Sequence, residues 1–192
     1  MFADCFKFIL YIAVIVLINI VGITLFFRAD LTNDKIYSLS EASRDVVATL
    51  SEPLSIKVFF SKDLPTPHNN TERYLKDLLE EYSSRGGKLF NYTFYDVSPE
   101  EGGLTQDTDE NREMAKNYGV QPVQIRIMED DEVKFKNAYM GLVIIHGDLI
   151  EKIPAITATS GLEYRLTTAI QKLNNKISAL LRLDEKVNVN MY

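Results

Sequence analysis

The sequence predicts an α/β (α+β) domain built on a mixed sheet, preceded by one transmembrane helix at the amino terminus. A long uncharged run near the start predicts the membrane helix, and a strand–helix–strand pattern follows it. Short strands and a long amphipathic helix come last. With 192 residues, 46% hydrophobic and 25% charged, the chain has a globular composition. The expected segments are a signal-anchor (1–28), a juxtamembrane elbow with a short helix (29–53), the globular domain (54–183) and the start of a further, truncated domain (184–192).

The run Phe8–Phe27, FILYIAVIVLINIVGITLFF, carries no charge. At 1.5 Å per residue it is about 30 Å long as a helix, which matches the hydrocarbon core of a bilayer. The alternatives are a cleaved signal peptide and a buried core helix. A signal peptide has a shorter apolar region followed by small residues, whereas this run ends in Phe26, Phe27 and Arg28. An uncleaved anchor is therefore favoured, with the Arg28 side chain reaching the headgroups.

The segment that follows the run, Arg28–Ser43, contains neither glycine nor proline. Ser38 and Glu41 have the spacing of a capping box, which predicts a helix from about Glu41 to Leu50. A flexible linker is usually rich in glycine, serine or proline. The segment is therefore interpreted as a fixed elbow rather than a flexible tether.

A strand–helix–strand unit opens the globular domain. Apolar residues alternate along Leu54–Phe60, and an amphipathic helix begins near Thr71 and ends at Gly86. Lys88–Val97 is rich in aromatic and β-branched residues, which is typical of a strand. Two strands joined through a helix are expected to be parallel.

An acidic loop is predicted over Ser98–Asn111, and a short helix over Arg112–Tyr118. The residues DTDEN within the loop suggest a calcium site. A calcium loop starting at Asp107 needs glycine at its sixth position and glutamate at its twelfth, where this chain has Arg112 and Tyr118. A solvated loop is therefore the better interpretation.

Three further strands and a long helix complete the prediction. The strands are Val123–Met128, Val133–Ile145 and Leu149–Ile153, with a tight turn at His146–Asp148 before the last. Ser160 and Glu163 form a second predicted capping box. Behind it, apolar residues at helical spacing extend to about Leu183, with a possible break at Asn174–Asn175, and Val187, Val189 and Met191 alternate like a new strand.

The order of these elements matches the thioredoxin-like topology. The chain has one cysteine, Cys5, so it lacks the Cys-x-x-Cys pair of dithiol redox enzymes and any disulfide framework. Gln121–Pro122 lies where thioredoxin-like folds often carry a cis-proline, but trans is the expected isomer because few X–Pro bonds are cis.

No catalytic, cofactor-binding or metal-binding residues are predicted. The histidines are His68, in a proline-containing loop, and His146, interpreted as a turn residue. The sequence contains no nucleophile elbow, phosphate-binding glycine loop or dinucleotide fingerprint. Its net charge of -6, without a basic patch, argues against nucleic-acid binding.

Five motifs in order resemble one family, the GldG-type auxiliary components of ABC transporters, named for gliding motility. They are DLTNDKIYSLS (30–40), IKVFFSKDLP (56–65), YGVQPVQ (118–124), AYMGLVIIHGD (138–148) and GLEYRLTTAIQKL (161–173). Together they cover most of the chain after Arg28. Members of this family usually continue into a second domain and a further membrane helix, so the resemblance implies that this chain is an amino-terminal fragment.

The resemblance implies a bacterial inner-membrane protein whose helix anchors an extracytoplasmic, periplasmic domain. Its partners would be an ABC permease, a cytoplasmic ATPase reached through the permease, and membrane lipid. No cofactor and no catalytic residue comes with the family, so a non-enzymatic subunit is expected. The alternatives are a stand-alone periplasmic module that binds a peptide or ligand by strand addition, and an enzyme of thioredoxin-like fold.

Overall fold

The computed structural model describes residues 7, 10–17, 38–62, 64–98, 106–129 and 132–189. The chain divides into two units, Met1–Ile36 and Tyr37–Tyr192. In the first unit, residues 10–17 are helical, and the rest of the predicted membrane span Phe8–Phe27 lies outside the described residues. Among the residues that are described, no helix is long and apolar enough to cross a membrane. The predicted elbow residues Arg28–Lys35 also lie outside the described part.

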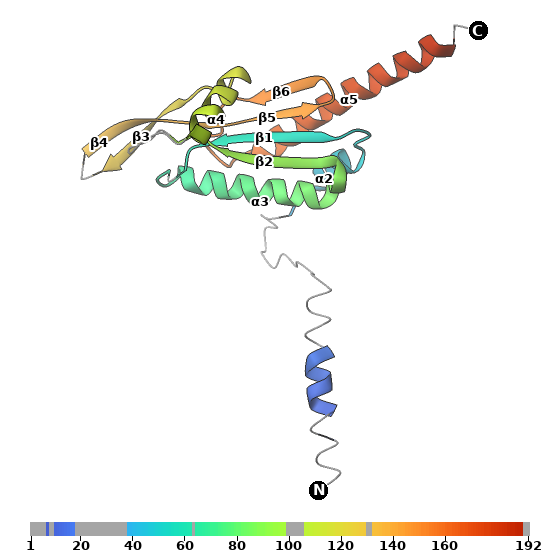
Figure 1. The fold of residues 1–192 in the computed structure, drawn as a ribbon, viewed down its shortest axis with the longest axis horizontal. Helices are drawn as coiled ribbons and strands as arrows, with labels where there is room; N and C mark the ends of the chain where they lie inside the picture. The colour runs from blue at the N-terminus through green and yellow to red at the C-terminus, as the bar shows by residue number, and fades with distance from the viewer. Residues whose placement is uncertain are drawn as a thin grey trace. The chain divides into compact units, whose positions relative to one another are not determined.

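The second unit is built around a mixed four-stranded sheet (Figure 1). Its strands, in order across the sheet, are β2 (Phe90–Asp96), β1 (Leu54–Phe60), β5 (Met140–His146) and β6 (Leu149–Ile153). β1 and β2 are parallel, as the strand–helix–strand pattern predicted, and β5 and β6 add antiparallel strands. The mixed α/β class is therefore confirmed.

Helices cover both faces of this sheet. They are α2 (Glu41–Ala48), α3 (His68–Gly86) with a 3-10 turn at Gly87–Leu89, α4 (Gln106–Asn117) and α5 (Leu162–Val189). The even-numbered residues of β1, among them Leu54 and Ile56, share one core with α2, α3 and α5. Phe59 points to the opposite face, where it packs with Ala115 of α4. The period of two along β1 thus divides the domain into three layers.

The first predicted capping box has the wrong N-cap residue, because Ser38 was expected to cap the helix. α2 begins at Glu41 as predicted, but its N-cap is Ser40, whose hydroxyl accepts a hydrogen bond from the Ser43 amide at 3.3 Å. The helix ends at Ala48, with Thr49 as C-cap, two residues before the predicted end at Leu50. Ser40 serves as the cap because it stands immediately before the first helical residue, where its hydroxyl can reach the amides of the first turn.

The predicted acidic loop is partly helical. α4 starts at Gln106, so the DTDEN residues belong to its first turns rather than to a loop. Asp107 and Asp109 lie in the first turn, where carboxylates interact favourably with the unpaired amides and the helix dipole. The acidic composition that suggested a solvated loop is equally suited to a helix start.

The long predicted strand Val133–Ile145 is two strands in two sheets. β4 (Glu132–Ala138) pairs only with β3 (Val123–Glu129) in a separate two-stranded sheet, and β5 pairs with β1 and β6. The change occurs at Tyr139. Its amide binds the Ser61 hydroxyl at 3.0 Å and its carbonyl accepts from the Ser61 amide at 2.9 Å. This pairing extends β1 by one residue at the point where the chain passes from one sheet to the other.

Three predictions about the carboxy-terminal segment are wrong. Ser160 does not cap it, because Gly161, with φ of 67°, precedes the first helical residue and its carbonyl accepts from Arg165. α5 then continues without interruption to Val189. Asn174 and Asn175 are not a break, and residues 184–189 continue the helix, whereas a strand was expected to begin at Val187.

Gln121–Pro122 is trans, as expected. Among the described residues, Thr66–Pro67 is the cis peptide bond.

Candidate functional site

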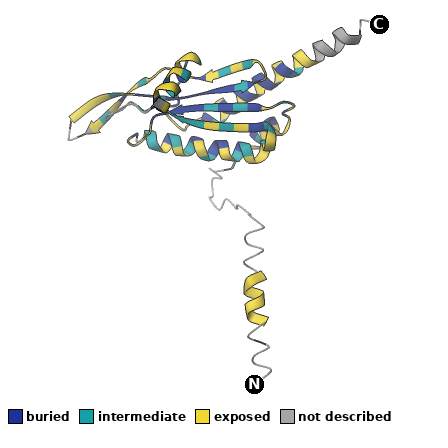
Figure 2. Cartoon of the chain, in the orientation of Figure 1, coloured by how far each residue is buried: buried dark blue, intermediate teal, exposed yellow. Residues whose placement is uncertain are grey.

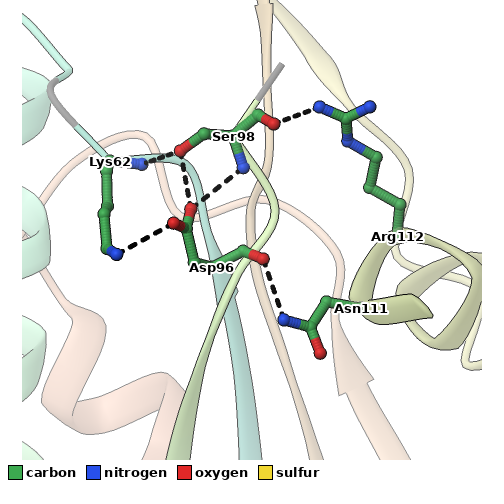
Figure 3. Close-up of polar contacts among 5 residues, drawn as sticks. All are labelled: Lys62, Asp96, Ser98, Asn111 and Arg112. Carbon is green, nitrogen blue, oxygen red and sulfur yellow. Dashed lines mark hydrogen bonds and ion pairs between the residues drawn. The ribbon is translucent and has the colours of Figure 1, made fainter. Parts of the chain in front are cut away.

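Polar side chains gather where the parallel strands β1 and β2 end (Figure 3). We name this set the strand-end cluster. Its members lie just after β1, at or just after the end of β2, or on α4. They are Lys62, Asp96, Ser98, Asn111 and Arg112. The carboxyl ends of parallel strands meet at one edge of a sheet, which is where ligands of open α/β sheets usually bind. The position alone makes this cluster the first candidate site.

Every oxygen of the Asp96 carboxylate is engaged. Oδ1 accepts from the Ser98 amide at 3.0 Å and from the Ser98 hydroxyl at 2.6 Å, and Oδ2 lies 2.9 Å from the Lys62 ammonium. The Asp96 carbonyl accepts from Asn111 at 3.0 Å, and Arg112 donates to the Ser98 carbonyl. The cluster therefore fastens the ends of both strands to α4.

The electrostatics of Asp96 oppose a role as a base. Partial burial raises the pKa of its carboxyl, but the hydrogen bonds from Ser98 and Lys62 together outweigh burial, so the pKa lies below its usual value. A general base at neutral pH needs a raised pKa. The arrangement stabilises a carboxylate and does not prepare it to accept a proton.

A second polar cluster lies where three helices meet, and we name it the helix-junction cluster. It consists of Ser40 and Ser43 at the start of α2, Tyr82 of α3, and Glu163 and Thr167 of α5. Glu163 Oε1 accepts from the Ser40 amide at 2.8 Å and from the Ser43 hydroxyl at 2.6 Å. The carboxylate expected to cap its own helix instead caps α2.

The remaining members join the same network. The Thr167 hydroxyl lies 2.7 Å from that of Ser43 and 2.5 Å from that of Tyr82, and it donates to the Glu163 carbonyl at 2.8 Å. Burial raises the pKa of Tyr82 to about 12. Burial also acts to raise the pKa of Glu163, but the hydrogen bonds from Ser43 and Ser40 hold it below its usual value. The cluster thus holds a neutral phenol and an ionised carboxylate.

His146 is not a turn residue. It is the last residue of β5 and has no exposed surface, and the turn consists of Gly147 and Asp148. Its Nδ1 lies 3.3 Å from the Pro53 carbonyl, which makes Nδ1 the protonated nitrogen, and Nε2 is buried without a protein partner. His68, the other histidine, is the first residue of α3. The two histidines belong to different elements, β5 and α3.

A shallow groove runs beside the edge strand β6. It has a volume of about 340 Å³ and lies between Glu151–Pro154 and the first half of α5. Lys172 of α5 crosses it to Glu151, with Nζ 2.8 and 2.9 Å from the two carboxylate oxygens. Arg165 donates to the Ala155 carbonyl at 3.2 Å. The groove combines an open strand edge with cationic side chains.

The sequence predicted no site residues, and both clusters were missed. In the ranges that the structure describes, no group of three or more His, Cys, Asp or Glu side chains could hold a metal ion. One signal for the strand-end cluster was available, because Asp96 and Ser98 follow a strand that was predicted to be parallel. The helix-junction cluster had no such signal, since Ser43 and Glu163 are far apart in the sequence.

Comparison with known proteins gives one family. The family described as a domain of unknown function (DUF7088) matches residues 33–145, which include the elements from α2 to β5. A protein of Borreliella burgdorferi described as uncharacterized is 24% identical over 160 residues, covering 82% of this chain and 29% of the relative. The chain therefore spans less than a third of that relative's length. No solved structure gives a significant match.

Proposed function

The chain belongs to the DUF7088 family, and we propose that it is a non-enzymatic, membrane-anchored auxiliary subunit of an ABC transporter. In this proposal the run Phe8–Phe27 is one uncleaved helix of the bacterial inner membrane. The domain lies on the periplasmic side, where it contacts the permease or its cargo, and it reaches the cytoplasmic ATPase only through the permease. The five motifs that resemble GldG-type components support the assignment of partner.

The observation that carries the proposal is the attachment of α2. The first helix after the proposed anchor is held to α5 by Glu163, which accepts from the Ser40 amide and the Ser43 hydroxyl. It also packs in the common core through Val46 and Val47. A domain held this way receives the chain at a defined point on its surface. That is useful to a subunit that must present one surface to a neighbour in the membrane.

Two further features favour a role in binding a partner protein over a role as an enzyme. The carboxylates of both polar clusters, Asp96 and Glu163, have lowered pKa values because hydrogen bonds outweigh partial burial. The order of the main sheet, β2-β1-β5-β6, with α3 between the parallel strands, supports a thioredoxin-like domain. Cys5, the one cysteine of the chain, precedes that domain, so dithiol chemistry is not part of the proposed function.

Co-purification tests the partner. The full-length protein, tagged and extracted in a mild detergent, should bring down an ABC permease and its ATPase. Replacing Asp30–Lys35 by glycine and serine should weaken the association while the domain stays folded. The matched control replaces the exposed loop Thr157–Thr159 in the same way and should change nothing. Recovery of the protein alone would refute the partner assignment, and an unchanged complex after the first replacement would refute the elbow.

Thiol labelling tests the location. Cys5→Ser removes the one native thiol, and Ala158→Cys places a new thiol on an exposed residue of the domain. A membrane-impermeant thiol reagent should label this variant in intact spheroplasts. Labelling that requires lysis would place the domain in the cytoplasm and contradict the proposal.

The groove beside β6 favours a second candidate, a membrane-tethered module that binds a peptide or ligand without a transporter. An extended segment could add to the open edge of β6 and face Arg165 and Lys172. If this second candidate is right, Arg165→Glu should abolish binding of the peptide or ligand. If the domain is a transporter subunit instead, the same variant should leave co-purification with the permease intact. The two functions are therefore separable with one variant.

A further inference from the structure

The β3–β4 hairpin exposes apolar side chains that the rest of the domain does not cover. Met128 is 75% exposed, Phe135 66% and Val133 44%. Met128 pairs with Val133, and Arg126 pairs with Phe135, so all four side chains share one face of the hairpin. In Figure 2 the hairpin is largely exposed or intermediate, in contrast to the buried strands of the main sheet. We name this set the hairpin patch.

The base and the tip of the hairpin differ. At the base, Ile125 and Ala138 are buried in the main core and fix the hairpin to the domain. Toward the tip, β3 and β4 pair only with each other, so the outer edge of β4 has no strand beside it among the described residues. A two-stranded sheet with an open edge is marginal by itself and readily accepts a further strand.

The residues of β4 are complementary to a second copy of β4 in the antiparallel direction. In the alignment centred on Lys134, Glu132 of each copy faces the partner's Lys136, and Val133 of each copy faces the partner's Phe135. Opposite charges and aromatic–β-branched pairs placed directly across strands both stabilise a sheet. The one unfavourable pair is Lys134 with the partner's Lys134, which lies on the two-fold axis. The two ion pairs between Glu132 and Lys136 offset its repulsion.

Neighbouring alignments are worse. Centred on Phe135, the pairing places Lys134 opposite the partner's Lys136 twice and leaves Glu132 opposite an alanine. Centred on Val133, it keeps the ion pairs as Glu132 with the partner's Lys134 but loses the pairing of Phe135 with Val133. A register shifted by one residue places the two-fold axis between two residues. It would put the apolar side chains of the two copies on opposite faces of the shared sheet. The charges exclude the register centred on Phe135, and the apolar pairing of Val133 with the partner's Phe135 favours the register centred on Lys134 over the one centred on Val133.

We propose that β4 pairs antiparallel with β4 of a second copy about a two-fold axis at Lys134, forming a four-stranded sheet across two chains. Rows of Met128, Val133, the partner's Phe135 and the partner's Arg126 then lie side by side on its patch face. A lipid surface is a poorer occupant, because residues 129–132 of the sequence read Glu-Asp-Asp-Glu and would repel anionic headgroups. The proposal does not depend on a transporter role.

Site-directed cross-linking tests the register. In the full chain with Cys5→Ser, in detergent micelles, single cysteines are placed at each position from Val133 to Asn137. Lys134→Cys should form a disulfide dimer readily, because directly opposed residues bring their Cβ atoms about 4.5–5.5 Å apart. Asn137→Cys, on the same strand but outside the two proposed ion pairs, is the matched control and should remain largely without a disulfide cross-link. A maximum at another position, or equal cross-linking at all of them, would overturn the register.

Charge reversal tests the pairing without a cysteine. Glu132→Lys and Lys136→Glu each turn two attractive pairs into repulsive ones and should each weaken self-association about 10- to 30-fold in sedimentation experiments. The double variant restores both ion pairs with opposite polarity and should return the association to near its original strength. Additive weakening in the double variant would refute the pairing.

A monomeric full chain at all concentrations would also refute it. Flotation with anionic vesicles that is lost in Phe135→Ser, without any dimer, would show that the patch meets lipid instead. A full chain that forms the dimer but does not co-purify with a permease would contradict the proposed function and leave the β4 pairing intact.

Discussion

Glu163 holds two helices together at the scale of a single residue. Its carboxylate oxygen accepts from the Ser40 amide at the start of α2, although Glu163 itself belongs to the first turn of α5. A carboxylate near a helix start is favourable both as an acceptor and through the helix dipole. Here one carboxylate lies near two helix starts, so its removal should affect both.

The first prediction concerns this carboxylate. Glu163→Ala should lower the free energy of unfolding by about 1–3 kcal/mol, because it leaves the Ser40 amide and the Ser43 hydroxyl without their charged acceptor. Ser160→Ala should change it by less than about 0.5 kcal/mol, since Ser160 is exposed and does not cap α5. Urea denaturation of both variants measures the difference. A larger loss for Ser160→Ala would restore the capping box that the sequence suggested.

The second prediction concerns Tyr82. Its neutral form is favoured in the folded state, where burial raises the pKa to about 12 from an ordinary value of 10.0. The stability that this contributes is therefore complete below pH 10 and lost as the pH rises toward 12. Phenolate absorbance should show a late-titrating tyrosine that disappears in Tyr82→Phe. Tyr74 and Tyr92 have smaller upward shifts and should remain as an internal reference.

At the scale of elements, β5 lies unusually close to its neighbours at Gly141. A methyl group there would lie 2.7 Å from a Val120 methyl carbon, 2.8 Å from the Pro154 carbonyl oxygen and 3.1 Å from the Ile153 carbonyl oxygen. Two of these three atoms are backbone and cannot turn aside. Glycine at this position lets the segment after β6 fold back over β5, where the Ile156 amide binds the Met140 carbonyl at 2.6 Å.

The third prediction follows from that contact. Gly141→Ala should destabilise the domain by about 1–3 kcal/mol through overpacking, and the exposed substitution Ser160→Ala again provides the reference. Thermal unfolding by circular dichroism gives the comparison. Equal melting temperatures for the two variants would mean that β6 can move away from β5 without cost.

At the scale of the whole molecule, two carboxylates on opposite faces of the sheet are expected to contribute to the response to acid. Asp96 joins the strand ends to α4, and Glu163 joins the helices on the other face of the sheet. The pKa of each lies below its ordinary value, 3.8 for Asp96 and 4.5 for Glu163, because hydrogen bonds outweigh burial. Their stabilisation is present above those ordinary values and is lost as the pH falls through the lower folded values.

The fourth prediction is a change in the acid limb of stability. The slope of the unfolding free energy between about pH 5 and about pH 3 should become shallower in Asp96→Asn and in Glu163→Gln, and shallowest in the double variant. The sites are in separate layers, so the two effects should add. Denaturant titrations across this range measure the slope. An unchanged slope in both single variants would mean that other carboxylates dominate acid unfolding.

The sequence predicted most of the elements of the fold, because they repeat a local pattern. Alternation along Leu54–Phe60 and the apolar stripe of α3 follow from side-chain periodicity, which is visible in any short window. The start of α4 and the division of β4 from β5 were missed for a common reason. DTDEN is compatible with both a loop and a first helical turn, and the division at Tyr139 coincides with hydrogen bonds to Ser61, a residue far away in the sequence.

The sequence by itself determined the α/β class, the parallel pair and the mixed character of the sheet, since these depend on periodicity and on the order of elements. The tertiary structure decided which partner each polar side chain serves. Glu163 caps α2 instead of its own helix, and His146 is buried at the end of β5 instead of belonging to the turn. A capping motif specifies donor and acceptor chemistry within four residues, but folding also brings donors from distant segments within hydrogen-bonding distance. The closer and better-oriented donor then forms the bond.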